Sequence, residues 1–205
     1  MILLKHRLEE KSLDEMCEKL FNDAAPYLTV RYNQEHTEIA FAFAKELQEI
    51  LGGRKEIIFP AIILHDVGWS AIAEELHLKA FGPNSDPELN RIHEIKGAKI
   101  AALLLLDISS LSPADKEEIC RIIESHDSGK NPITLEEKIV KDADKLFRFS
   151  PRGFSIDAQR FNVDSKEYWN KLNEFRKDWF FTEPAKTIAE RQLVKVEQEV
   201  INKGN

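Results

Sequence analysis

Apolar residues recur at steps of three and four along most of this chain, and this spacing restricts its fold more than any other feature. One series is Ile39, Phe43 and Leu47, and segments 119–123 and 139–146 show the same spacing. Such steps place side chains on one face of an α-helix, which can then pack against neighbouring helices. No alternating run is bracketed by Asn-Gly or Gly-Gly hairpin turns. We therefore predict an all-α protein.

Residues typical of helix ends divide the chain into segments. Ser12, Ser112 and Thr134 each precede an acidic residue by three positions, as in a capping box, and predict helix starts. Loops are expected at Gly52-Gly53 and in the segments that begin at Phe81, Ser128 and Ser150.

The chain is interpreted as a single all-α domain spanning residues 1–205. Its core is expected at about 31–150, and C-terminal helices at about 151–205. The segment after residue 151 is richer in aromatic side chains and predicts a helical pair packed on the core. A separate second domain is an alternative that the sequence leaves open.

Charge and composition exclude several classes of partner. The formal net charge is −7, without any long block of Lys or Arg, which argues against a nucleic-acid-binding surface. The longest apolar run, from Ile100, is too short to cross a membrane, and the N-terminus does not resemble a signal peptide. Cys17 and Cys120 are far apart in the sequence and lie outside any C-x-x-C motif. They therefore predict neither a disulfide nor a zinc site, which is typical of proteins in reducing compartments. We expect a cytoplasmic protein without membrane or nucleic-acid partners, and leave its oligomeric state open.

Four of the six histidines lie at predicted helix ends beside apolar stripes. His36 and His93 open helices, whereas His65 and His126, each followed by Asp, close helices. Antiparallel packing would bring these ends together, and facing helices of a bundle commonly build metal sites. Imidazoles and carboxylates together suit Mn, Fe, Co, Ni or Zn. A bound cation would also compensate for the cost of burying these groups.

Other polar residues near these segments are expected to have no functional role. His6 and His77 have no acidic partner at a suggestive spacing. Four cations lie close in sequence to the histidines and would meet a phosphate only if they faced the site, although a solvated helix face is the simpler interpretation: Lys96, Lys99, Lys145 and Arg148.

The ordered set of His36, His65-Asp66 and Asp144 resembles the signature of the HD-domain metal-dependent phosphohydrolases. That signature is a His, a His-Asp dipeptide and a distal Asp in a helix. The segment "DADKL" (142–146) resembles the distal element, in which the Asp directly before Lys or Arg is the ligand. Asp144 is therefore assigned, and Asp142 is left without a role. The resemblance, to small bacterial and archaeal members, covers about residues 31–200.

The resemblance implies an HD-domain helical bundle around one divalent transition metal per chain, with Mg as an alternative and a second metal left open. The implied ligands are His36, His65, Asp66 and Asp144, and Asp66 could also accept a proton from the attacking water. Catalytic roles are expected for His93 and His126, which would bind a second metal, contact the substrate phosphate or protonate the leaving oxygen. The role of Asp127 is open.

Differences between this chain and known members of the family narrow the range of expected substrates. Alarmone hydrolases of the family carry a Glu-Asp pair soon after the dipeptide, where this chain has Gly68-Trp69-Ser70. Cyclic-dinucleotide phosphodiesterases carry a Gly-Tyr-Pro motif and a paired His-His, whereas this chain has His126-Asp127. The expected substrate is a small phosphorylated molecule, a nucleotide whose base cannot be read. Alternatives are a di-iron oxygenase of the same superfamily and a non-catalytic nucleotide sensor.

Overall fold

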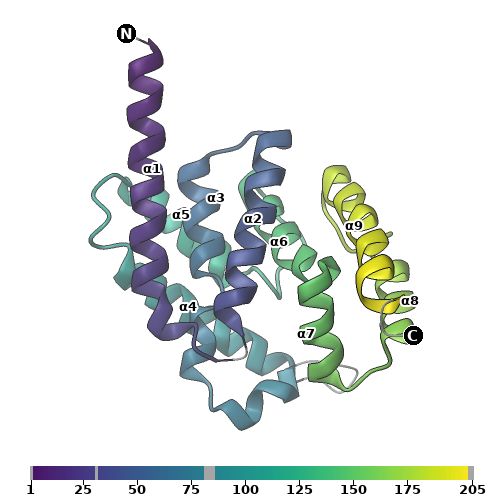
Figure 1. Cartoon of the computed structure of the whole chain (residues 1–205). Coiled ribbons are helices and arrows are strands. Elements are labelled where there is room, and N and C mark those ends of the chain that lie inside the picture. Colours follow the sequence, from purple (N-terminus) through teal and green to yellow (C-terminus); the bar gives the residue numbers. More distant parts are fainter. Residues whose placement is uncertain (1, 31, 81–85, 203–205) are drawn as a thin grey trace.

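The computed structural model describes residues 2–30, 32–80 and 86–202, with the backbone alone for residues 2–9, 78 and 80. Within these ranges the chain is helical and contains no β-strand, so the predicted all-α class is confirmed (Figure 1). None of the described helices combines the length and apolar character needed to span a membrane.

The longer helices follow one another along the chain. They are α1 (Ile2–Ala24), α2 (Asn33–Leu51), α3 (Lys55–Leu64), α4 (Pro87–Leu104), α5 (Pro113–Glu124), α6 (Leu135–Leu146), α7 (Pro151–Phe161), α8 (Ser165–Phe175) and α9 (Glu183–Val196). Short 3₁₀ turns are η1 (Ala25–Tyr27), η2 (Val67–Ala71), η3 (Glu74–Ala80) and η4 (Phe147–Phe149), and a π-helical turn, η5 (Glu197–Ile201), follows α9. The connection between α3 and α4 contains two of these 3₁₀ turns, η2 and η3.

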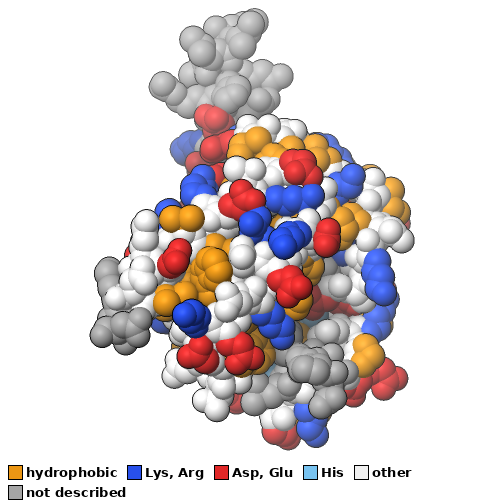
Figure 2. Space-filling view, turned by 90° about the vertical axis from the view of Figure 1, so that its right-hand side faces the viewer, with side chains coloured by type: hydrophobic (Ala, Val, Ile, Leu, Met, Phe, Trp, Pro, Cys, Tyr) orange, Lys and Arg blue, Asp and Glu red, His pale blue; other side chains and the backbone are white. Residues whose placement is uncertain are grey.

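Helix α3 is the centre of the bundle. Every residue from Ile57 to Leu64 is buried, and the helix contacts α1, α2, α5 and α6. A helix that is apolar on all sides is stable only when other helices surround it. Helix α9 packs against α2 and α6, and α7 and α8 pack against α9 (Figure 1). From the side of α8 and α9, basic and acidic side chains are interspersed with apolar ones (Figure 2).

Two of the three predicted helix starts are confirmed. The Ser112 hydroxyl accepts from the backbone N–H of Asp115, and Thr134 caps α6 in the same way. The start predicted at Ser12 is wrong, because α1 begins at Ile2 and continues unbroken through that position. The loop predicted from Ser150 is also wrong, since Ser150 caps α7 and Pro151 fills its first turn.

Two other helix boundaries differ from those predicted from the sequence. Helix α4 begins at Pro87, with the side chain of Asp86 as its cap, so His93 lies inside the helix and does not open it. Residues 81–85 of the predicted loop fall outside the described residues. Three helices, not a pair, follow residue 150, because the Ser150-Pro151 start adds α7. The division into a core and C-terminal helices stays a prediction.

The turn after α3 lies directly on α4, and Gly68 allows this contact. A Cβ atom on Gly68 would lie 2.0 Å from the carbonyl oxygen of His93 and 2.5 Å from the backbone nitrogen of Gly97. A Cβ on Gly97, by contrast, would lie 3.4 Å from the carbonyl oxygen of His65, an ordinary contact. The segment after His65 and the helix that carries His93 are therefore held together backbone to backbone.

Replacing Gly68 with Ala is expected to lower the free energy of unfolding by about 3 kcal/mol, because backbone atoms must move to admit the methyl group. The matched control is Gly97→Ala, which should stay within about 1 kcal/mol of wild type, since Ala is favoured inside a helix. Denaturant unfolding followed by circular dichroism measures both. Equal stability of the two variants would contradict this packing.

Candidate metal centre

Four predicted ligands meet at one end of the bundle. His36 lies in the first turn of α2, His65 and Asp66 follow α3, and Asp144 lies in α6. His36 Nε2 lies 3.0 Å from His65 Nε2 and 3.1 Å from Asp144 Oδ1. Asp66 Oδ2 lies 3.7 Å from both imidazole nitrogens. All four side chains are buried, so the distances suit a small cation shared among them.

A second group of donors adjoins the first. His93 Nε2 and His126 Nε2 are 3.2 Å apart, and Asp127 Oδ2 lies 3.7 Å and 4.0 Å from them. Asp66 Oδ1 faces the same pair at 3.7 Å and 3.8 Å. The structure thus joins His93 and His126 to the predicted ligands, and it adds Asp127, for which the sequence indicated no role.

Asp66 lies between the two groups. Its Oδ2 atom faces the pair formed by His36 and His65, and its Oδ1 atom faces the other pair. The indole Nε1–H of Trp69 donates to Oδ1 at 3.0 Å and fixes the carboxylate plane. The Trp69 ring also stacks on His93, with centroids 4.2 Å apart and an interplanar angle of 15°. One aromatic residue therefore orients members of both groups.

Backbone carbonyls set the tautomers of two imidazoles. His65 Nδ1 lies 2.7 Å from the carbonyl oxygen of Ile62, and His126 Nδ1 lies 2.7 Å from that of Ile123. A carbonyl oxygen only accepts, so each Nδ1 carries the hydrogen, and Nε2 is the atom available to a metal. His93 Nδ1 is buried without a hydrogen-bond partner, and its ring is held by stacking.

The charges in the centre perturb one another strongly. Burial alone would raise the pKa of Asp66 and Asp144, but the surrounding imidazoles hold both values well below the usual range. Burial would lower the pKa of His126, but Asp127 and Asp66 raise it to about 10. For His93, burial and then the charge on His126 outweigh the opposing effect of Asp66 and Glu94 and lower the pKa to about 3.

This donor set fits divalent cations. Two pairs of imidazole nitrogens face each other at 3.0 Å and 3.2 Å in buried positions, where lone pairs repel unless a proton or cation lies between them. Three carboxylates supply the negative charge that a cation compensates, and the mixture of nitrogen and oxygen donors suits Mn, Fe, Co, Ni or Zn. The residues that could hold metal ions are His36, His65, Asp66, His93, His126, Asp127 and Asp144.

Buried charges next to the ligands hold the turn that carries His126. The Glu94 carboxylate accepts from the backbone N–H groups of Asp127 at 2.9 Å and Ser128 at 2.8 Å. The Lys141 ammonium donates to the carbonyl oxygens of Ser125 and His126. Sequence reasoning missed both residues, although a charge on an apolar helix face is itself a sign of a buried partner.

Asp142 and Lys145, beside the predicted ligand Asp144, point away from the centre. The buried Asp142 carboxylate accepts from the backbone N–H groups of Phe181 and Thr182, both at 2.9 Å, and from the Thr182 hydroxyl at 2.8 Å. Lys145 donates to the carbonyl oxygen of Trp179 at 2.8 Å. Helix α6 therefore carries the predicted ligand on one face and binds the segment before α9 with another.

The remaining predicted polar residues lie outside the centre. Lys96 and Lys99 are exposed. His77 is buried, and its Nε2 contacts the carbonyl oxygen of Ile72 at 2.9 Å. The side chain of His6 falls outside the described residues. Only Arg148, of the four cations considered from the sequence, lines the cavity that adjoins the donors.

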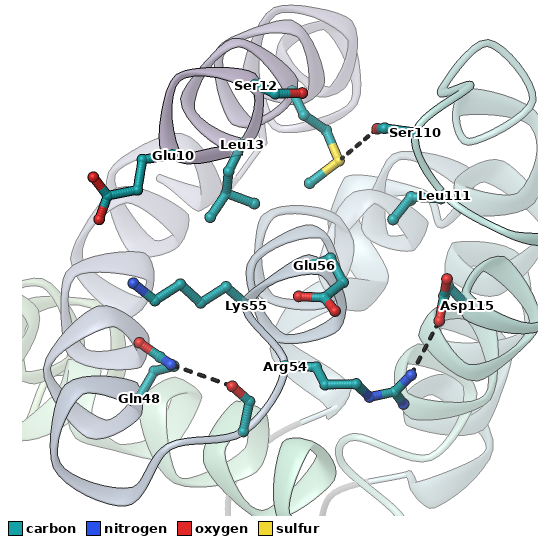
Figure 3. A pocket seen from close by; sticks show the side chains of 12 residues that line it. Glu10, Ser12, Leu13, Gln48, Arg54, Lys55, Glu56, Ser110, Leu111 and Asp115 are labelled. Carbon is teal, nitrogen blue, oxygen red and sulfur yellow. Dashed lines mark hydrogen bonds and ion pairs between the residues drawn. The ribbon is translucent and has the colours of Figure 1, made fainter. Parts of the chain in front are cut away.

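A larger cavity, of about 680 Å³, does not touch this centre. It lies between α1, the start of α3 and the segment before α5, and Arg54 on its wall is paired with Asp115 (Figure 3). Since α3 rises about 1.5 Å per residue, its start and the histidine after its end face opposite ends of the bundle. None of the donor residues lines the larger cavity.

Comparison with known proteins places this geometry in a family. The sequence profile of the HD domain matches residues 33–148, more than half of the chain, and the match includes all seven donor residues. The chain belongs to the HD-domain family. Members of this family are generally metal-dependent hydrolases that bind divalent metals.

One solved structure supports the fold. A predicted HD superfamily hydrolase from an uncultured Thermotogales bacterium is similar, with a TM-score of 0.59, 20% identity and 92% of each chain covered. At this identity the likeness shows the fold alone. The search of curated proteins found no match.

The two aspartates of α6 should behave differently. Asp144→Asn replaces a charged donor by a neutral amide and should lower metal affinity by more than about 100-fold. Asp142→Asn, the matched control, loses hydrogen bonds to the α9 segment and should lower the free energy of unfolding by about 2 kcal/mol, while metal affinity changes by less than about tenfold. Metal titration calorimetry and denaturant unfolding test this ranking, and its reversal would show that Asp142 is the ligand.

Proposed function

We propose that this HD-domain protein is a phosphohydrolase that acts on a small phosphorylated molecule, and that Asp66 would help to hold two divalent cations. The observation that carries the proposal is the position of Asp66, whose two oxygens face separate imidazole pairs. Sites with two neighbouring metal ions are typical of phosphatases and nucleases.

The proposal assigns a set of ligands to each ion. The first would be held by His36, His65, Asp66 and Asp144, and the second by Asp66, His93, His126 and Asp127. Direct phosphate contact or leaving-group protonation by His93 and His126 is less well supported, because both rings are buried and their Nε2 atoms face carboxylates. Imidazole donors favour Mn, Fe, Co, Ni or Zn over Mg at both positions.

Bound divalent cations lower the pKa of a coordinated water and neutralise charge on phosphoryl oxygens. The residues of the chain orient these donors and handle protons. Asp66 is already engaged by Trp69 and four imidazoles, which suits a bridging ligand better than the proton acceptor expected from the sequence. The Asp127 side chain is 33% exposed, against 11% for Asp66 and Asp144, so we assign proton exchange with solvent to Asp127.

A nucleotide remains the proposed substrate class, and a screen can define it. The metal-free protein is loaded with each candidate cation and assayed for phosphate release from nucleotides, sugar phosphates and simple aryl phosphates. Release of phosphate from at least one class by the metal-loaded protein alone supports the proposal. Metal-loaded protein that binds nucleotides without turnover would instead support the sensor alternative.

Asp66→Ala is expected to abolish metal binding and hydrolysis together, because it removes the ligand common to both ions. Elemental analysis measures the metal content, and phosphate release measures turnover. Asp107→Ala, which changes an exposed aspartate in the segment after α4, is the control and should retain both. Wild-type metal content in Asp66→Ala would refute the bridging role.

The second donor group also keeps one alternative open. A pair of ions held by histidines and carboxylates suits di-iron oxygen chemistry as well as hydrolysis. Two irons per chain with oxygen uptake, and no phosphate release, would favour the oxygenase.

A further inference from the structure

A small cavity of about 30 Å³ adjoins the metal centre, and two kinds of residue line it. Some are donor residues, including His36, Asp66 and Asp144. Others, namely Asn33, Arg148, Asp157 and Arg160, do not belong to the proposed ligand sets. Two guanidinium groups, those of Arg148 and Arg160, therefore lie beside the predicted metal ligands.

A buried carboxylate positions both arginines. Asp157, in α7, is 1% exposed and accepts from Arg148 Nε at 3.1 Å and from Arg160 Nη1 at 3.0 Å. The Tyr168 hydroxyl of α8 adds a third bond to the same carboxylate at 3.2 Å. An ordinary ion pair joins one arginine to one carboxylate. Here two arginines bind the single buried carboxylate of Asp157, and both line the same cavity.

The terminal amino groups of Arg148 are available as hydrogen-bond donors. Its Nε is bonded to Asp157 and its guanidinium lies over the ring of Trp179, 5.5 Å from the centroid. Among the described residues, none accepts a hydrogen bond from its two terminal amino groups. An arginine fixed through Nε presents these groups as a planar fork, the geometry that binds two oxygens of a phosphate.

Asn33 provides a second and independent observation. It begins α2, it is 3% exposed, and it lines the same cavity. Its side-chain amide nitrogen is buried without any hydrogen-bond partner. Buried donors are almost always satisfied in proteins, so an unpaired donor facing a cavity indicates a ligand that accepts from it.

We propose that Arg148, Arg160 and Asn33 form a subsite for the non-bridging oxygens of a terminal, dianionic phosphate group, so that the enzyme is specific for phosphate monoesters or terminal phosphates. This inference rests on the proposed phosphohydrolase function. A monoester has three non-bridging oxygens and two negative charges for these donors, whereas a diester has two oxygens and one charge. The subsite therefore discriminates against diesters.

The subsite also gives the C-terminal helices a role. Asp157 and Arg160 come from α7, Tyr168 from α8, and Trp179 from the segment before α9. All four lie beyond residue 148, where the match to the HD domain ends. The part of the chain that follows the shared domain thus supplies Arg160 and the residues that position Arg148, while Arg148 and Asn33 themselves lie within that domain.

The decisive test is the binding of inorganic phosphate to the metal-loaded protein, measured by calorimetry. Arg148→Gln should weaken phosphate binding by at least about tenfold, the effect of one charge-assisted hydrogen bond, with unchanged metal content. The matched control is Arg191→Gln, which removes an exposed ion pair with Glu46 and should leave phosphate affinity unchanged. Circular dichroism checks folding, and Asn33→Ala, which leaves the Asp157 contacts intact, should weaken binding in the same direction.

Kinetics supply the second readout. Arg148→Gln should lower kcat/KM for p-nitrophenyl phosphate by about tenfold or more, mainly through KM, and that for bis(p-nitrophenyl) phosphate by less than about threefold. Equal phosphate affinity in wild type, Arg148→Gln and Asn33→Ala overturns the inference, whether or not the wild type hydrolyses esters. Arg148-dependent phosphate binding without hydrolysis of any ester would support the subsite and contradict the proposed function.

Discussion

The carboxylate of Asp66 lies 3.7–3.8 Å from four imidazole nitrogens, and the geometry of the centre depends on how this buried charge is compensated. An isolated buried carboxylate costs several kcal/mol, and facing imidazole lone pairs add repulsion. Cations on either side of Asp66, as proposed, would remove both costs. The ends of α2, α3 and α5, and the inner faces of α4 and α6, converge here because the central apolar helix α3 delivers Asp66 to this point.

Three further buried charges tie the ligands to the rest of the fold. Glu94 and Lys141 hold the turn that carries His126, and Asp142 binds the segment before α9 from the helix that carries Asp144. A hydrogen bond to such a buried charge typically contributes about 1.5–3 kcal/mol. The stability of the bundle and the geometry of the metal centre therefore depend on the same few helices, and the C-terminal helices are coupled to the centre through α6.

The helix class followed from apolar spacing, and the order of His36, His65-Asp66 and Asp144 was enough to predict that these four residues lie together. The place of Asp127 beside His93 and His126 could not be predicted, since it depends on the turn after α5 meeting α4. Nor could the pairing of Asp142 with Thr182, forty positions away. Trp69 was noted only as a departure from relatives, although it orients Asp66. Contacts between distant segments are set by packing, which periodicity alone does not specify.

The central claim is that two cations flank Asp66, and anomalous X-ray diffraction from crystals loaded with Mn or Zn tests it directly. The account predicts two anomalous peaks per chain, about 3.5–4 Å apart. One should lie against His36, His65 and Asp144, and the other against His93, His126 and Asp127. A single peak at the first position in fully loaded crystals, with none beside His93 and His126, would contradict it.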